Sequence, residues 1–350
     1  MRSSYSIDDV VLLLKDITGL VKPQSSEERE KLIQSGVHYC EMLPIEYKPS
    51  DKYMQIYNEL LDIFAEKVAD AVAVLSKQIY ESRGRDVVLV SLARAGLPVG
   101  ILLKRYLKFK YNIDVPHYGI SIIRGRGIDK VALEYLIDKF GSKRLLFVDG
   151  WTGKGAIAGQ LTEALKEFSD ISDDLAVIAD PAGVAKYYGT RDDLLIPSSC
   201  LNSTVSGLIS RTFLRDDIIG KNDFHGAVYY GELEDNDLSY SFIEAVQKHF
   251  SLDIKTEDVS LFIDTGLDEA RRIADQYGIR DINLVKPSIG EATRVLLRRV
   301  PWKILISEKS RGSIEVAHIL RLAEEKNVPV EYVKLVHYKA VGLIKELADV

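Results

Sequence analysis

The sequence predicts an α/β protein of two domains: a doubly wound parallel sheet with an N-terminal helical extension, followed by a smaller αβα sandwich. Apolar strand-like runs alternate with helical runs from residue 86 onward. The length of 350 residues exceeds the roughly 100–200 residues typical of one domain. A polar segment at 251–258 separates two such alternating patterns. We place the boundary there, which gives domains 1–255 and 256–350.

The N-terminal extension is predicted to be mainly helical. Apolar residues repeat at helical spacing from Asp51 to Ser82, among them Tyr53, Ile56 and Leu60. This stretch is therefore expected to form one long helix with a buried apolar face.

Four apolar runs ahead of the boundary are predicted to be strands of the large sheet. The first three are each followed by a helical stretch after a short link, which is the pattern of parallel strands joined by crossover helices. Ligands of such sheets bind at the carboxyl ends of the strands. The four runs are 86–92, 117–125, 145–150 and 175–180.

The second domain repeats the alternation on a smaller scale. A last helix is expected after residue 334. The strands predicted ahead of it are 259–264, 281–287, 302–309 and 328–334.

Composition excludes several classes of protein. The 46 Lys and Arg against 52 Asp and Glu give a net charge of −6, so any site for a polyanion has to be a local patch. Two cysteines, Cys40 and Cys200, are too few for a disulfide framework and have no metal-ligand spacing. The longest apolar runs fall short of the ~18 residues of a membrane span. We expect a cytoplasmic protein that does not bind a membrane.

The sharpest local signal is the run LLFVDGWTGKGAIAGQL at 145–161. An apolar strand ends at Asp149, and a glycine-rich turn leads into a helix. The N–H groups of such a turn suit a phosphate, with Thr152 and Lys154 as further donors, while Asp149 suits sugar hydroxyls. The spacing is not that of a Walker A loop, because Gly155 follows the lysine. An ordinary turn, in which glycine only permits tight packing, is the alternative.

This run resembles the diphosphate-sugar fingerprint of phosphoribosyltransferases, in which two acidic residues and a threonine-rich turn lie between a strand and a helix. Asp149 matches the first acid and Gly155 the glycine of the turn. Gly150 replaces the second acid, and Gly153 and Lys154 stand where the threonines would be. The resemblance implies that Asp149 fixes a ribose and that the turn binds its 5′-phosphate.

Two further loops fit the same resemblance. The loop after the first predicted strand carries Arg94, Ala95 and Gly96, which would face the diphosphate leaving group. The loop after the second carries Arg124 and Arg126, whose guanidinium groups suit bidentate pairing with a diphosphate. A glycine-capped loop and a solvated arginine pair are the alternatives.

Nearly the whole chain resembles the phosphoribosyltransferase-type family of tellurium-resistance and stress gene clusters, to which a Pelota-type RNA-binding domain is attached. The segments that carry this resemblance are 38–44, 93–100, 117–129, 147–155 and 180–212. It implies an enzyme that uses phosphoribosyl diphosphate with Mg²⁺ to make or transfer a nucleoside-like product, with an unidentified small-molecule acceptor. Asp149, Arg124 and Arg126 would be its catalytic residues.

Two other functions stay open. One is a non-catalytic regulator that senses a nucleotide and binds RNA. The other follows from the cysteine-protease label, StiP, that members of this family also carry, and it needs Cys200 as a nucleophile activated by a histidine. Cys200 lies in a loop rich in Ser, Thr, Asn and Gly, which also suits contact with substrate or simple packing. The six histidines show no recognisable cysteine-protease signature.

The second domain resembles the kink-turn-binding fold shared by certain ribosomal proteins and Pelota. Glu291, Thr293 and Arg294 match an Asn-Glu-x-Thr-Lys motif that contacts RNA in relatives, and Gly290 replaces its asparagine. Arg294 and Arg298 belong to a basic cluster, although the domain has 15 Lys and Arg against 15 Asp and Glu. The resemblance implies RNA as a partner, bound through Glu291, Thr293, Arg294 and Arg298. A solvated helix face is the alternative.

Overall fold

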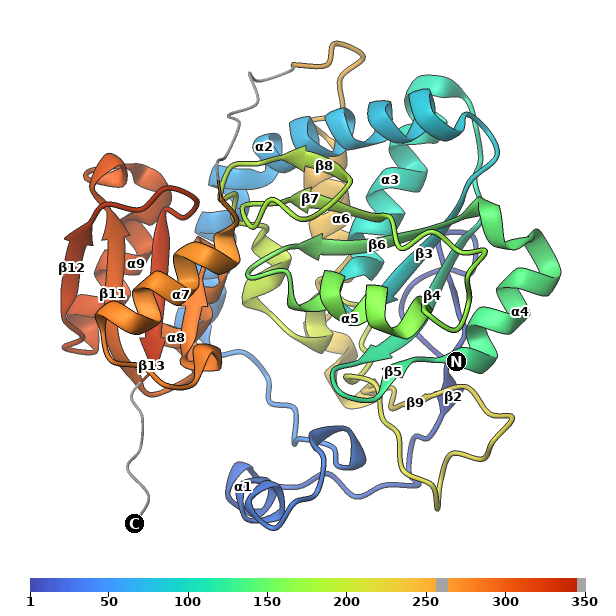
Figure 1. Cartoon of the computed structure of the whole chain (residues 1–350), viewed down its shortest axis with the longest axis horizontal. Helices are drawn as coiled ribbons and strands as arrows, with labels where there is room; N and C mark the ends of the chain where they lie inside the picture. The colour runs from blue at the N-terminus through green and yellow to red at the C-terminus, as the bar shows by residue number, and fades with distance from the viewer. Residues whose placement is uncertain (256–263, 345–350) are drawn as a thin grey trace.

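The computed structural model describes residues 1–255 and 264–344. It confirms the predicted fold class: a large α/β domain with a parallel sheet stands beside a smaller C-terminal domain of sheet and helices (Figure 1). The predicted strand at 259–264 falls mostly on 256–263, and the predicted boundary adjoins this segment, which lies outside the described residues.

The large domain is organised around one sheet. Its strands are β1 (Val11–Leu12), β3 (Val88–Ala93), β4 (His117–Ile123), β5 (Gly127–Ile128), β6 (Leu145–Trp151), β7 (Leu175–Ala179) and β8 (Tyr187–Thr190). They lie in the order β1-β4-β3-β6-β7-β8, with β5 antiparallel to β4 and the other pairs parallel. The strand order reverses between β3 and β6, which is where sheets of this kind bind ligands. A separate small pair joins β2 (Lys15–Asp16) to β9 (Gly226–Ala227).

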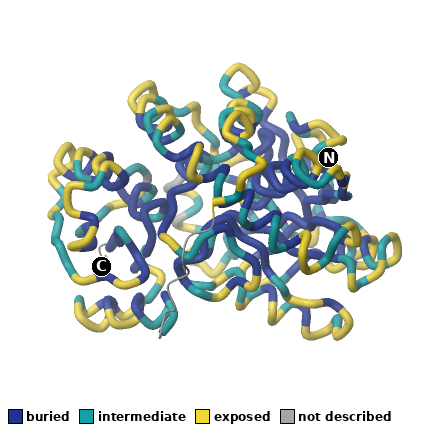
Figure 2. Tube along the Cα trace, turned by 90° about the horizontal axis from the view of Figure 1, so that it is seen from above, coloured by how far each residue is buried: buried dark blue, intermediate teal, exposed yellow. Residues whose placement is uncertain are grey.

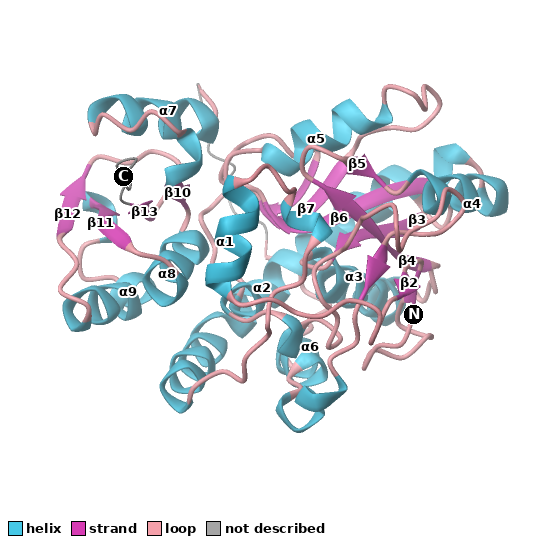
Figure 3. Cartoon of the chain, turned by 90° about the horizontal axis from the view of Figure 1, so that it is seen from below, coloured by secondary structure: helices cyan, strands magenta, loops and turns pink. Residues whose placement is uncertain are grey.

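Helices cover both faces of this sheet. They are α2 (Asp51–Arg83), α3 (Gly96–Tyr111), α4 (Lys130–Phe140), α5 (Ala156–Leu165) and α6 (Ser239–Gln247), with the short α1 (Ser26–Gln34) ahead of them. One core lies under α2, α3 and α6, and a second lies under α4 and α5. Figure 3 shows α2, α3 and α6 on one side of the sheet and α5 on the other. The sheet is therefore doubly wound, as predicted.

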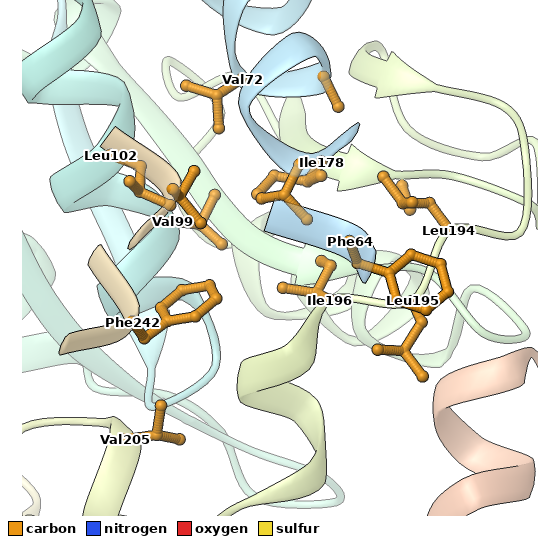
Figure 4. Close-up of a cluster of buried hydrophobic side chains, with 14 of the residues drawn as sticks. Phe64, Val72, Val99, Leu102, Ile178, Leu194, Leu195, Ile196, Val205 and Phe242 are labelled. Atoms are coloured by element: carbon orange, nitrogen blue, oxygen red, sulfur yellow. The ribbon is translucent and has the colours of Figure 1, made fainter. Parts of the chain in front are cut away.

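A capping side chain and a glycine determine the two ends of the long helix α2. The Ser50 side chain accepts a hydrogen bond from the N–H of Tyr53 and caps the first turn. Gly84 ends the helix with a positive φ of 58°. Phe64 from this helix belongs to the same buried cluster as Phe242 of α6 and Ile178 of β7 (Figure 4). Figure 2 shows the same distribution, with buried residues in the middle of the domain and exposed ones along its outer helices and loops.

The C-terminal domain contains a mixed four-stranded sheet. Its elements are α7 (Gly266–Gln276), β10 (Val285–Pro287), α8 (Ile289–Arg298), β11 (Pro301–Ser307), α9 (Ile314–Glu325), β12 (Val330–Val333) and β13 (Ala340–Ile344). The strand order is β10-β13-β11-β12. The prediction of a helix after residue 334 is wrong over 340–344, because this apolar run fills the gap between β10 and β11 as an antiparallel strand.

The two domains share one continuous hydrophobic core. Apolar residues of α8, α9 and β11 belong to the same buried cluster as those of α2 and of the 3-10 helix η3 (Pro197–Cys200). At the edge of this contact, Arg321 of α9 forms an ion pair with Glu59 of α2 at 2.7 Å, and Glu315 forms one with Lys67. The C-terminal domain is thus packed onto the large domain rather than tethered to it.

No helix of residues 1–255 and 264–344 combines the length and the hydrophobicity needed to cross a lipid bilayer.

Candidate functional site

A cavity of about 290 Å³ opens at the carboxyl ends of β3, β4 and β6, where the strand order reverses. Figure 1 shows the C-terminal domain beside this end of the sheet. Both domains line the cavity: the large domain provides the loops after β3, β4 and β6, and the C-terminal domain provides Asn283, Lys286, Pro287, Glu291 and Arg294. The cavity is therefore an interdomain site.

Positive charge predominates in the lining of this cavity. Its acidic side chains among the described residues are Asp149 and Glu291. Its basic side chains are Arg94, Arg124, Lys154, Lys286 and Arg294. Such a donor set suits an anion better than Mg²⁺, which prefers carboxylate and phosphate oxygens. Across the described part of the chain, no three His, Cys, Asp or Glu side chains gather as metal ligands. Mg²⁺ binding stays a prediction.

Asp149 is the buried carboxyl group of the cavity. It lies near the end of β6, is 8% exposed, and accepts a hydrogen bond from the N–H of Gly150 at 2.8 Å. Burial raises the pKa of Asp149 to about 7. The group can therefore either accept or donate a hydrogen bond to a hydroxyl near neutral pH.

The glycine-rich turn after β6 is held by both domains. The Thr152 hydroxyl is buried and donates to Asp180, so the large domain already engages it. The Lys154 ammonium donates to the carbonyls of Ile282 at 2.5 Å and Val285 at 3.1 Å in the C-terminal domain. Burial, together with the nearby Lys286 and Arg124, lowers the pKa of Lys154 to about 8.

The remaining glycines of this turn connect β6 to α5. The carbonyl of Gly153 accepts a hydrogen bond from the Tyr338 hydroxyl at 2.7 Å. Gly155 precedes α5 with a positive φ of 77°, a conformation that favours glycine. The first residues of α5, Ala156 and Ile157, thus line the cavity next to a turn that the C-terminal domain supports.

The loop after β3 forms the opposite wall. Arg94 and Ala95 line the cavity, and Arg94 Nη1 donates to the carbonyl of Ile209 at 2.9 Å. Gly96 lies against β6, where a Cβ atom would approach the Val148 carbonyl oxygen to 2.3 Å. Only glycine permits this approach.

The loop between β4 and β5 links the cavity to a second feature. Arg124 lines the cavity, and its backbone N–H donates to the Tyr39 hydroxyl at 3.0 Å. Arg126, expected to be catalytic, does not line the cavity and instead forms an ion pair with Glu41 at 2.6 Å. Tyr39 and Glu41 bound the 3-10 helix η1 (Tyr39–Glu41).

That short helix carries a cysteine and histidine pair, which the sequence reasoning missed. His38 Nδ1 lies 3.0 Å from the sulfur of Cys40. The Cys40 sulfur also lies 3.6 Å from the carbonyl oxygen of Leu214, and the residue is completely buried. Burial raises the pKa of the Cys40 thiol, Arg126 opposes this, and Glu41 adds to it. The His-x-Cys spacing in the segment at 38–44 was the signal available in the sequence.

Cys200, the nucleophile considered from the sequence, lies elsewhere. It is completely buried in the core shared by the two domains, at the end of η3, and its carbonyl accepts a hydrogen bond from the Tyr53 hydroxyl. Its neighbours Ser199 and Leu201 line a second cavity.

The described side chains among the residues expected to bind RNA fall into two groups. Glu291 and Arg294 line the interdomain cavity and pair with each other at 3.0 Å. Thr293 is completely buried, and its hydroxyl contacts the Ile289 carbonyl and the His318 ring. Arg298 lies in α8, and its side chain is outside the described part of the structure.

Comparisons with known proteins cover both domains. Residues 3–247 match the family model described as Tellurite-like stress resistance cysteine protease StiP, and residues 264–346 match the PELOTA RNA binding domain. A curated relative from Acinetobacter baylyi (strain ATCC 33305 / BD413 / ADP1), named Cysteine protease StiP, is 35% identical over 367 residues. That alignment covers 98% of this chain and 94% of the relative.

Solved structures match a smaller part of the chain. A hypoxanthine-guanine phosphoribosyltransferase from Bacillus anthracis is 18% identical, with a TM-score of 0.28, and the match covers 36% of this chain and 77% of that one. A hypothetical protein from Neisseria gonorrhoeae with bound ppGpp is 18% identical, with a TM-score of 0.26, over 35% of this chain and 77% of that one. Likenesses this partial do not transfer a substrate.

The predicted glycosyl transfer from phosphoribosyl diphosphate is therefore wrong, as is the alternative of a non-catalytic regulator. The family and the relative that cover most of the chain are both named as cysteine proteases. The sequence is consistent with this correction, because the strand end has the single carboxylate of Asp149 where the diphosphate-sugar fingerprint has two acids. The family resemblance seen in the sequence is confirmed. The chain belongs to the StiP family, with a C-terminal domain of the Pelota RNA-binding type.

Proposed function

We propose that this chain is a cysteine peptidase in which Cys40 is the nucleophile and His38 the general base. The observation that carries the proposal is the 3.0 Å separation between the Cys40 sulfur and His38 Nδ1. A thiol within hydrogen-bond reach of an imidazole is the arrangement that cysteine hydrolases use to form a thiolate. The family and the curated relative bear a cysteine-protease name, which supports the same chemistry.

The hydrogen bonds around the ring define the direction of proton transfer. The backbone N–H of Cys40 donates to His38 Nδ1 at 3.4 Å, so Nδ1 is an acceptor and the neutral ring carries its proton on Nε2. The thiol proton then passes to Nδ1, and the thiolate attacks the carbonyl carbon of the scissile amide. The imidazolium returns a proton to the leaving amine as the C–N bond breaks. Water, deprotonated by the same ring, next cleaves the thioester and restores the thiol.

In the structure the thiol of this pair is covered, while His38 is half-buried. Cys40 is completely buried, and the neighbouring backbone is held by arginines: Arg211 donates to the Tyr39 carbonyl at 2.8 Å, and Arg215 to the Glu41 carbonyl at 3.2 Å. A substrate can reach the sulfur only after these contacts or the β4–β5 loop move. A thiol nucleophile also has to stay reduced, which suits the cytoplasmic location expected from the sequence.

The experiment compares cysteine and histidine variants in hydrolysis of fluorescently labelled casein and in labelling by iodoacetamide. Cys40→Ala is expected to abolish hydrolysis, and His38→Ala to lower its rate by about 10²–10⁴-fold. The matched controls are Cys200→Ala, in the core, and His249→Ala, on the surface. Full hydrolysis by Cys40→Ala, or its loss in a folded Cys200→Ala, would overturn the assignment.

We also propose that the C-terminal domain binds RNA. The match of residues 264–346 to the PELOTA RNA binding domain supports this. The proposal is tested by fluorescence anisotropy of labelled RNA with the full chain at rising salt, where the affinity is expected to fall as phosphate contacts are screened. Failure of the full chain to bind any RNA at low salt would refute it.

A further inference from the structure

The second cavity, of about 190 Å³, adjoins the interdomain cavity, and the two share Arg94, Ala95, Trp151 and Arg294 in their linings. We call the combined space the interdomain groove. Its first part is lined by the glycine-rich turn and the C-terminal domain. Its second part is lined by polar residues of η3 and of the segment after it, among them Ser198, Asn202 and Ser206.

The charge of the groove calls for an anionic occupant. Burial, with Lys286 and Arg124 nearby, lowers the pKa of Lys154, and burial is also the main cause that lowers the pKa of Lys286. Two crowded ammonium groups with depressed pKa values gain stability when an anion enters between them. The N–H groups at the start of α5 add to this potential, because Gly155 precedes that helix and provides no side-chain cap.

Trp151 gives the groove an aromatic surface. The residue ends β6, is half-buried, and lines both cavities, as Arg94 and Arg294 do. Aromatic side chains in a cationic groove are the surfaces on which bases of a single strand stack while phosphates meet the positive charges. A ligand without a ring would leave this surface unused.

Asp149 is the second, independent indication of a ligand. The residue is more than nine-tenths buried and lines the groove, and its carboxyl group accepts a hydrogen bond from the N–H of Gly150. A ribose hydroxyl is a matching partner, because it donates to a carboxylate and accepts from a carboxylic acid. The 2′-hydroxyl is the group that lets a protein distinguish RNA from DNA.

We propose that a single strand of RNA binds in the interdomain groove, with a base on Trp151, a ribose hydroxyl on Asp149 and a phosphate at the turn around Lys154. The inference rests on the RNA binding proposed for the C-terminal domain and adds that the large domain forms half of the site. It follows that Glu291 and Arg294 of α8 meet RNA inside the groove rather than on an outer face.

The test measures anisotropy of a short, labelled single-stranded RNA with the full chain. Trp151→Ala is expected to weaken binding by about 10-fold or more, whereas Trp151→Phe keeps most of the affinity because a ring remains. Asp149→Asn is expected to reduce the preference for RNA over DNA of the same sequence. Arg271→Ala, on the exposed part of α7, is the matched control and leaves binding unchanged. Circular dichroism verifies the fold of each variant.

Four results would overturn the inference. If folded Trp151→Ala bound RNA as tightly as the parent chain, the RNA site would lie outside the groove, although the chain would still bind RNA. Preference for duplex RNA over the single strand would exclude a stacked strand. If adenosine monophosphate displaced the RNA completely and bound with the same affinity, the groove would be a site for a mononucleotide. Absence of RNA binding by the parent chain would remove the inference together with the proposed RNA function.

Discussion

Asp193 offers a direct measure of how firmly the two domains are joined. The residue follows β8 in the large domain and is 1% exposed. Both of its carboxyl oxygens accept from the N–H of Ile289, the first residue of α8, at 3.0 and 3.1 Å. One of them also accepts from the N–H of Lys339 at 2.9 Å. A single side chain thus satisfies two backbone donors of the other domain.

Replacing Asp193 by Ala removes both acceptors and leaves two buried N–H groups without them. Each buried donor left unsatisfied costs ~1–3 kcal/mol, so the free energy of unfolding is expected to fall by about 2–6 kcal/mol. The loss includes the attraction between a carboxylate and the N-terminus of α8. Asp193→Asn keeps one acceptor oxygen and is expected to show an intermediate loss.

The assay is urea unfolding of the full chain, followed by circular dichroism. Burial raises the pKa of Asp193 to about 7, so the measurement is made near pH 8.5, where the carboxylate is ionised. The adjacent Asp192 is the control, because about half of its side chain is exposed and its partner Lys339 keeps a second ion pair with Glu315 at 2.8 Å. Its removal should therefore cost less than ~1 kcal/mol. An Asp193→Ala variant as stable as Asp192→Ala would refute the reasoning.

Three further predictions concern the turn, the cysteine pair and the sheet. Burial raises the pKa of Asp149 to about 7 from its ordinary 3.8, so the folded chain keeps this proton where the unfolded chain loses it. The free energy of unfolding is then expected to fall by up to ~4 kcal/mol as pH rises from about 4 to about 7, and Asp149→Asn should lack this fall. If the free energy of unfolding of the parent chain and of the variant changed with pH in the same way, the prediction would be contradicted. Glu41→Gln breaks the ion pair with Arg126 and removes a charge that raises the pKa of the Cys40 thiol. Alkylation of Cys40 by iodoacetamide in the folded chain should therefore become faster, and an unchanged rate would argue against a covered thiol. Gly96→Ala places a Cβ 2.3 Å from a carbonyl oxygen of β6 and should cost ~1–3 kcal/mol in urea unfolding, and an unchanged midpoint would show that the loop yields freely.

The sequence was sufficient for features that depend on neighbouring residues. The long helix was predicted as Asp51–Ser82 and is found as Asp51–Arg83, because helical spacing and the Ser50 and Gly84 signals are local. The strands β3, β4, β6 and β7 were predicted from their apolar runs, and the place of Asp149 at a strand end followed from them. The strand Ala340–Ile344 was missed because a short apolar run has no periodicity that separates a buried strand from a helix.

By itself, the sequence determined the alternation of strands and helices, the glycine-rich turn after β6 and the family of the chain, since each is written in contiguous residues. Only the tertiary structure decided that the His38 ring and the Cys40 thiol face each other, because His-x-Cys spacing does not set the orientation of the two side chains. Cys200 lies instead in the apolar core that the two domains share. It also decided that the C-terminal domain closes over the turn, where Lys154 and Tyr338 form hydrogen bonds between the domains. Contacts between residues far apart in the chain depend on how two finished surfaces fit together, and no local pattern records that fit.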